Sequence, residues 1–124
     1  MNPIPAVKVL IVDDDEDLLE MVTLMLRANQ MQVTGLATAT RLLETLQTDP
    51  PDLLLMDIFL GDNDGRQICR ELKNSGSYPH LPIFLYSAGD ISAASINEST
   101  ADHFFRKPFE MQQLVSRIHQ TLQK

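Results

Sequence analysis

The sequence predicts an α/β fold in which five parallel strands alternate with five helices. Five short apolar runs are separated by segments of helical period, and strict alternation of this kind implies a parallel sheet with right-handed crossovers. Four of the five runs end on polar residues, at the sheet edge where open α/β sheets bind their ligands. A length of 124 residues fits one domain with a real core, so we expect residues 1–124 to form a single domain.

The five apolar runs are the predicted strands, and they span residues 9–12, 33–37, 53–56, 83–86 and 104–106. All but the second lead into polar side chains, which are Asp13 to Asp15, then Asp57, then Ser87 and finally Lys107. Because parallel strands present their carboxyl ends at one edge, these side chains should converge. The second run leads into no reactive side chain.

Two helices are predicted in the first half of the chain. The first should begin near Asp15, because acidic residues suit the first turn of a helix. Its apolar face repeats at helical spacing through Leu18, Val22, Met25 and Leu26. The second should be capped by Thr38 or Thr40 and end at residues 49–51, where two prolines stop it. Its apolar residues are Leu42, Leu43 and Leu46.

Three more helices are predicted in the second half. The third begins near residue 65 and stops at 74–76, and the fifth follows Pro108. Their apolar positions are Ile68, Cys69 and Leu72, and then Met111, Leu114, Val115, Ile118 and Leu122. Between them only Ile91 and Ile96 are large and apolar, and the serine, threonine and asparagine around them compete with helical backbone bonding. The fourth helix should therefore be short and weakly packed.

Composition narrows the class of protein. The net charge of −7 argues against a nucleic-acid surface, which normally shows a basic stripe. Cys69 is the only cysteine, so no intramolecular disulfide can form and a reducing, cytoplasmic location is expected. No apolar stretch approaches the roughly 20 residues that span a bilayer, so no membrane association is expected. Residues 1–6 lack the features of a signal peptide and should form an extended lead-in, because Pro3 and Pro5 disfavour a helix.

The strand-end residues suit a divalent cation and a phosphoryl group. Magnesium (Mg2+) prefers hard oxygen ligands, and Asp13, Asp14 and Asp57 supply carboxylates at neighbouring strand ends. A bound cation would relieve their mutual repulsion and leave one carboxylate free to act as a nucleophile that forms an acyl phosphate. Ser87 and Lys107 could then hold and neutralise the phosphoryl oxygens.

With these residues in place, residues 7–122 resemble the receiver domain of two-component response regulators. The resemblance is carried by five motifs in order: Val-Asp-Asp at 12–14, Pro-Asp-Leu-Leu-Leu-Met-Asp at 51–57, Asp-Gly at 64–65, Pro82 through Ser87-Ala88, and Lys-Pro-Phe at 107–109. It implies a flavodoxin-like, doubly wound (βα)5 fold with strand order 2-1-3-4-5. The second strand, which carries no reactive residue, would then lie at the sheet edge.

The resemblance also implies roles for individual residues. Asp57 would be the phosphoacceptor, receiving its phosphoryl group from a phosphohistidine on a sensor histidine kinase or a histidine phosphotransfer protein. Asp14, Asp57 and the backbone carbonyl of Phe59 would bind magnesium directly, and Asp13 through water. Such a protein is a signalling switch and not an enzyme beyond its own phosphorylation and dephosphorylation; its downstream target cannot be identified from the sequence.

Three further residues gain expected roles from the resemblance. Ser87 would be the switch hydroxyl, Lys107 would meet the phosphoryl group, and Phe104 would be the aromatic rotamer switch. The Lys107–Pro108 peptide bond would be cis, which proline tolerates. Phosphorylation would then change the surface made by the fourth helix, fifth strand and fifth helix.

The chain also departs from the family pattern. Gly61 stands where proline is usual, and the segment between Ser87 and Phe104 is about two residues short. These departures leave open an alternative, a receiver-fold interaction module that is never phosphorylated. A phosphohydrolase of the haloacid-dehalogenase type is a weaker alternative, because its second aspartate is replaced here by Phe59.

Overall fold

The central element of the structure is a five-stranded parallel sheet. A computed structural model describes residues 6–89 and 91–123. The sheet has the order β2-β1-β3-β6-β7, in which all four neighbouring pairs are parallel. Its strands are β1 (Lys8–Val12), β2 (Gln32–Leu36), β3 (Leu53–Asp57), β6 (Ile83–Ser87) and β7 (His103–Arg106). Counted along this sheet alone, the order is the expected 2-1-3-4-5, which confirms the predicted fold.

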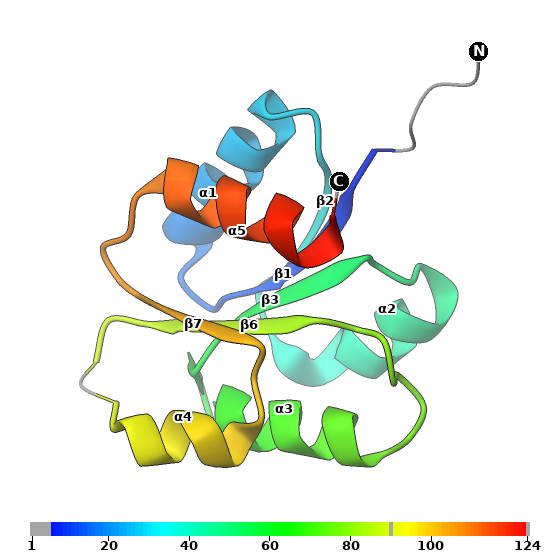
Figure 1. Cartoon of the computed structure of the whole chain (residues 1–124), viewed down its shortest axis with the longest axis vertical. Helices are drawn as coiled ribbons and strands as arrows, with labels where there is room; N and C mark the ends of the chain where they lie inside the picture. Colours follow the sequence, from blue (N-terminus) through cyan, green and yellow to red (C-terminus); the bar gives the residue numbers. More distant parts are fainter. Residues whose placement is uncertain (1–5, 90, 124) are drawn as a thin grey trace.

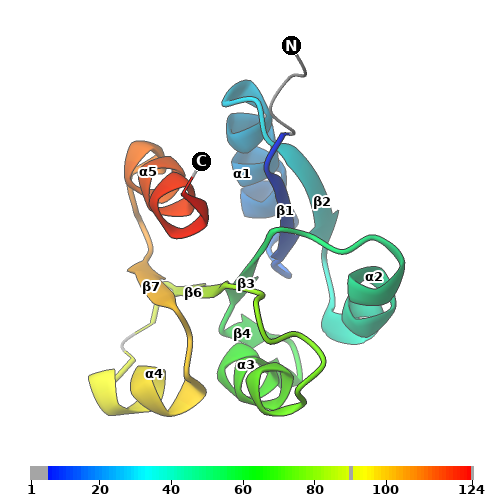
Figure 2. The ribbon, with the colours of Figure 1, turned by 45° about the vertical axis from the view of Figure 1, so that its right-hand side comes forward.

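Helices cover both faces of the sheet. In the described part of the chain the α-helices are α1 (Glu16–Ala28), α2 (Leu42–Thr48), α3 (Gly65–Asn74), α4 (Ala93–Ser99) and α5 (Met111–Leu122). Figures 1 and 2 show α1 and α5 on one face of the sheet, and α2, α3 and α4 on the other. This is the doubly wound arrangement, and it leaves the carboxyl ends of the strands at one uncovered edge.

The strands build a core on each side of the sheet, because successive side chains point to opposite faces. Ile11 of β1, Leu55 of β3 and Tyr86 of β6 pack on the side of α1 and α5. Leu10, Leu54, Met56 and Leu85 are among the residues that pack on the opposite side. Burial of both faces explains why the inner strands β3 and β6, and β1 beyond Lys8, are continuous apolar runs without polar alternation.

Two predicted helix faces are partly wrong. Met25 of α1 is 39% exposed and Leu43 of α2 is 58% exposed, whereas Val22, Leu26, Leu42 and Leu46 are buried. In α2 the reason is helical spacing, because Leu42 and Leu46 share the buried face and Leu43, one residue on from Leu42, does not. A 3-10 turn, η1 (Ala39–Arg41), precedes this helix of seven residues. Thr38 stands at the start of η1 but its side chain makes no capping hydrogen bond. The predicted threonine cap is therefore absent.

A small hairpin after β3 was not predicted. Its strands β4 (Phe59–Leu60) and β5 (Asn63–Asp64) are antiparallel and are joined by a turn at residues 61–62. Gly61 in this turn has a φ of +63°, a left-handed conformation that glycine adopts without steric cost. The hairpin begins two residues beyond Asp57, and so the chain folds back over the carboxyl edge of the sheet.

The fourth helix is short, as predicted. It has seven residues, and the Ser92 hydroxyl caps its start by accepting a hydrogen bond from the Ser95 amide. Thr100 ends it in a left-handed conformation with a φ of +61°. Of the predicted extended lead-in, residues 1–5 lie outside the part that the structure describes. Within residues 6–89 and 91–123, no helix has the length and apolar character to span a membrane.

Candidate functional site

The polar strand-end residues lie together at the carboxyl edge of the sheet. Asp13 and Asp14 follow β1, Asp57 ends β3, Ser87 ends β6, and Lys107 follows β7. Carboxylate oxygens of Asp13, Asp14 and Asp57 all lie within 4.8 Å of one another. The edge strand β2 contributes a backbone carbonyl, that of Leu36, which accepts from the Asp13 amide over 3.0 Å.

Asp57 is the buried carboxylate that ends β3. It is 6% exposed, and its Oδ2 lies 3.3 Å from the Lys107 ammonium. Its Oδ1 accepts a long hydrogen bond of 3.4 Å from the Phe59 amide. Burial raises the pKa of the Asp57 carboxyl to about 6, because Lys107 only partly offsets the loss of solvent and Asp13 adds repulsion. A cation at this site would remove that repulsion.

Asp13 is fully buried and its carboxylate is held by three donors. The Asp15 amide donates to Oδ1 over 2.9 Å, while the Tyr86 hydroxyl and the Lys107 ammonium donate to Oδ2 over 2.5 Å and 3.3 Å. Burial, followed by the bond to Asp13, raises the pKa of the Tyr86 hydroxyl well above its ordinary value, so that it stays a donor. Sequence reasoning missed Tyr86. Its signal is a tyrosine inside a buried apolar strand, where the hydroxyl needs a partner.

Asp14 is the exposed member of the cluster, and its Oδ2 accepts from the Gly61 amide over 3.2 Å. This bond fastens the turn of the β4–β5 hairpin to the end of β1. The three carboxylates together form a set of hard oxygen donors on one open side of the sheet, which is the chemistry that magnesium requires. The residues present therefore fit a magnesium ion, with Asp13, Asp14 and Asp57 as the side chains that would hold it.

Gly65 is required where it stands. A Cβ added to it would lie 2.3 Å from the backbone carbonyl oxygen of Asp57, far inside van der Waals contact. Its own amide donates to the Ile58 carbonyl over 2.7 Å. Helix α3 thus begins in direct backbone contact with the end of β3, and this close approach keeps the strand end in place.

The remaining predicted residues occupy the side of the site formed by β6 and β7. Ser87 is fully buried, its Oγ accepts from the Gly89 amide over 3.2 Å, and its carbonyl accepts from the Lys107 amide over 2.9 Å. The Lys107–Pro108 peptide bond is cis. Phe104 is half-buried and packs against the core beneath α3 and α4, on the face of β7 opposite Phe105.

Phe59 is an exposed aromatic ring beside the site, with 52% of its surface accessible. The Arg66 guanidinium carbon lies 5.9 Å from the ring centroid, and a Cβ added to Gly89 would lie 3.2 Å from the ring's Cε2 atom. Arg66 also forms a two-pronged ion pair with Asp64, which lowers the pKa of that carboxyl, and donates to the Ser95 hydroxyl over 2.8 Å. The Arg66 side chain therefore connects the β4–β5 hairpin, α3 and α4.

A comparison with known protein families identifies the family to which this chain belongs. The profile of the response regulator receiver domain matches residues 9–119. The chain belongs to this family. Receiver domains are phosphorylation-controlled switches of two-component signalling systems and are not classical enzymes.

Named relatives agree with this membership. The receiver domain is 30% identical over 117 residues to the DNA-binding response regulator MtrA of Mycolicibacterium paratuberculosis, covering 94% of this chain and 52% of MtrA. It is 30% identical over 121 residues to the response regulator MprA of Mycobacterium ulcerans, covering 96% of this chain and 51% of MprA. The chain thus spans about half the length of the curated relatives it matches.

Solved structures show the same architecture. A crystal structure of a putative response regulator from Chloroflexus aurantiacus matches with a TM-score of 0.88 and 34% identity, over 97% of this receiver domain and all of that chain. A CheY-like receiver domain protein from Methanospirillum hungatei matches with a TM-score of 0.86 and 24% identity, over 96% of this chain and 95% of the other. Because its sequence identity is only 24%, the match to the Methanospirillum hungatei protein supports the fold alone.

Proposed function

We propose that this receiver domain, formed by residues 1–124, accepts a phosphoryl group on Asp57 in the presence of magnesium. The observation that supports the proposal is the grouping of Asp57 with two further carboxylates and the Lys107 ammonium, which lies 3.3 Å from both Asp57 and Asp13. A carboxylate nucleophile is thereby placed among cation-binding oxygens and a fixed positive charge. The carboxylate and the incoming phosphoryl group are both anionic, so a bound cation and the Lys107 ammonium are needed to offset their repulsion.

The donor that fits this chemistry is a phosphohistidine on a sensor histidine kinase or a histidine phosphotransfer protein. An Asp57 oxygen attacks phosphorus, an aspartyl phosphate bond forms, and the phosphorus–nitrogen bond breaks. The departing imidazole nitrogen takes up a proton. A bound magnesium ion would supply positive charge against the phosphoryl oxygens, and in this proposal Asp13, Asp14, Asp57 and the Phe59 carbonyl would hold it. The Asp57 carboxyl must be ionised to attack, which its pKa of about 6 allows at neutral pH.

Ser87 and Lys107 respond to the new group in this proposal. Lys107 leaves its shared position between Asp13 and Asp57 and binds a phosphoryl oxygen. The Ser87 hydroxyl, whose oxygen accepts from the Gly89 amide, donates its proton to a second phosphoryl oxygen. Movement of the loop from β6 to α4, together with reorientation of half-buried Phe104, would then change the surface of α4, β7 and α5 that a downstream target reads.

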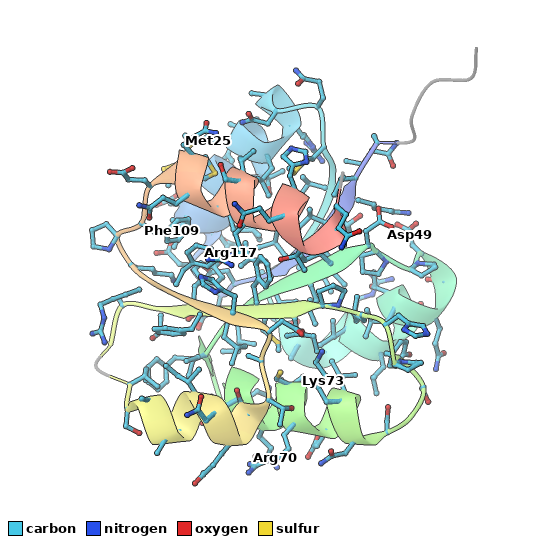
Figure 3. The ribbon with its side chains drawn as sticks, in the orientation of Figure 1. Met25, Asp49, Arg70, Lys73, Phe109 and Arg117 are labelled. Carbon is cyan, nitrogen blue, oxygen red and sulfur yellow. The ribbon has the colours of Figure 1, made fainter. Side chains whose placement is uncertain are left out.

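The partner that donates the phosphoryl group needs a docking surface next to Asp57. An apolar cleft of about 450 Å³ lies beside Lys107, between α1 and the start of α5. Its lining includes Met25 and Phe109, which Figure 3 places on α1 and in the loop before α5. The neighbouring Met21 is also 48% exposed. We infer that the phosphohistidine domain covers this cleft, because a donor imidazole that reaches Asp57 brings its own protein surface against it.

Phosphorylation by a small donor tests the proposal. Wild-type protein is incubated with acetyl phosphate or phosphoramidate and magnesium, and intact-mass spectrometry follows the addition of one phosphoryl group. Wild type should gain the group, and the Asp57→Asn variant and a magnesium-free sample should not. Equal behaviour of wild type and variant would refute Asp57 as acceptor. It would instead favour the unphosphorylated interaction module.

A further inference from the structure

Tyr86 contacts two charged groups of the site at once. Its hydroxyl donates to Asp13 Oδ2 over 2.5 Å, and the Lys107 ammonium lies 4.5 Å from the centroid of its ring. The ring packs edge-on against Phe109 and the side chain is fully buried. In the sheet register Tyr86 pairs with Asp57, so its hydroxyl reaches past β3 to the carboxylate that follows β1.

The contacts of Asp13 show what this hydroxyl does. Within the described residues, the donors to Asp13 Oδ2 are the Tyr86 hydroxyl and the Lys107 ammonium. The lysine is shared equally with Asp57, at 3.3 Å from each carboxylate. The hydroxyl bond is much shorter and is shared with no other group among these contacts. When Lys107 turns toward a phosphoryl group on Asp57, the hydroxyl is the donor that remains on Asp13 Oδ2.

We propose that Tyr86 is a positioning residue for the magnesium site. Its hydroxyl holds the Asp13 carboxylate in the orientation that faces the ion, and its ring face holds the Lys107 ammonium between the two carboxylates until a phosphoryl group arrives. The inference rests on the proposed function, because it concerns the ion that Asp13, Asp14 and Asp57 would bind.

The Tyr86→Phe variant isolates the hydroxyl. It removes one oxygen atom and keeps the ring that packs on Phe109 and under Lys107. Without the hydroxyl, Asp13 Oδ2 keeps only Lys107, which is then drawn away from Asp57, and the carboxylate can rotate away from the ion. Loss of a hydrogen-bonding partner behind a metal-binding carboxylate typically weakens metal binding by 10–100-fold. We expect about a tenfold weaker magnesium affinity for this variant.

The test is a magnesium titration of unphosphorylated protein, followed by amide chemical shifts in two-dimensional NMR. Tyr78→Phe is the matched control, because it makes the same chemical change at the chain's other tyrosine, in the loop before β6. Tyr78→Phe should bind magnesium as wild type does, and Tyr86→Phe should bind about tenfold more weakly. Amide spectra without magnesium establish that each variant is folded.

A double-mutant cycle distinguishes positioning from a general structural effect. If Tyr86 acts through Asp13, the Tyr86→Phe change should have no further effect on magnesium affinity in an Asp13→Asn background. Unchanged affinity in Tyr86→Phe, or the same loss in both backgrounds, would overturn the inference while leaving the proposed function intact. Failure of wild type itself to bind magnesium would overturn both.

Discussion

Replacing Asp57 by asparagine is expected to stabilise the magnesium-free protein at neutral pH. Asparagine has the shape of a protonated aspartate, and the folded site favours that form because burial and Asp13 raise the pKa of Asp57 from 3.8 to about 6. In the unfolded chain the same carboxyl ionises at its ordinary pKa. The difference corresponds to about 3 kcal/mol of unfolding free energy at pH values above 6. For a chain of this length that is roughly 10 °C in midpoint temperature.

The sign of the pH dependence follows from the direction of this shift. Below the unfolded pKa of 3.8 the carboxyl is protonated in both states, so Asp57 and asparagine differ little. As the pH rises from about 4 to about 6, the unfolded wild type loses its proton first, and the contribution of Asp57 to stability falls. The advantage of Asp57→Asn should therefore grow over this interval and level off above it.

Urea unfolding followed by circular dichroism measures this difference, in buffers containing a chelator. Asp62→Asn provides the matched control, since Asp62 is exposed in the hairpin turn and should show no comparable gain. Added magnesium should stabilise wild type more than Asp57→Asn, because the ion binds the ionised carboxylate. Equal stability of wild type and Asp57→Asn at neutral pH, or an advantage that grows as the pH falls, would refute the electrostatic account of the site.

Three other substitutions probe separate features. Gly65→Ala should lower the unfolding free energy by about 1–3 kcal/mol in a denaturant titration, because its Cβ would overlap the Asp57 carbonyl; a variant as stable as wild type would contradict this close contact. Arg66→Ala should speed hydrogen exchange at the start of α4 while leaving α5 unchanged, since it removes the bond to Ser95. Leu43→Gln should change stability by no more than about 0.5 kcal/mol, because the side chain is 58% exposed; a larger loss would mean that it is packed.

The strands and the site were predictable because their signals are local. Strands β1, β3 and β6 are almost continuous apolar runs. Because parallel strands end at one edge of the sheet, Asp57, Ser87 and Lys107 could be placed together at that edge. The faces of the helices were less predictable. Leu42 and Leu43 are both leucine and adjacent, so their types do not tell which of them faces the core; in the structure Leu42 is buried and Leu43 is 58% exposed.

Tyr86 and the β4–β5 hairpin were missed for a different reason. A hairpin of two residues on each side has no periodicity to detect, and Gly61 alone indicates only a turn. The bond from the Tyr86 hydroxyl to Asp13 joins residues 73 positions apart in the chain. Such a contact depends on the side-by-side packing of β1, β3 and β6, which no local pattern contains.

Arg66 gives the site a second mechanical connection to α4. The first is the bond that the Gly89 amide, shortly before that helix in the sequence, donates to the Ser87 hydroxyl. The second runs from the hairpin that follows Asp57, through the planar guanidinium, to the Ser95 hydroxyl in the first turn of α4. Because both connections reach the same end of one helix, a Ser87→Ala protein should keep part of its α4 response to phosphorylation, seen as a reduced but measurable shift of the Ser95 amide.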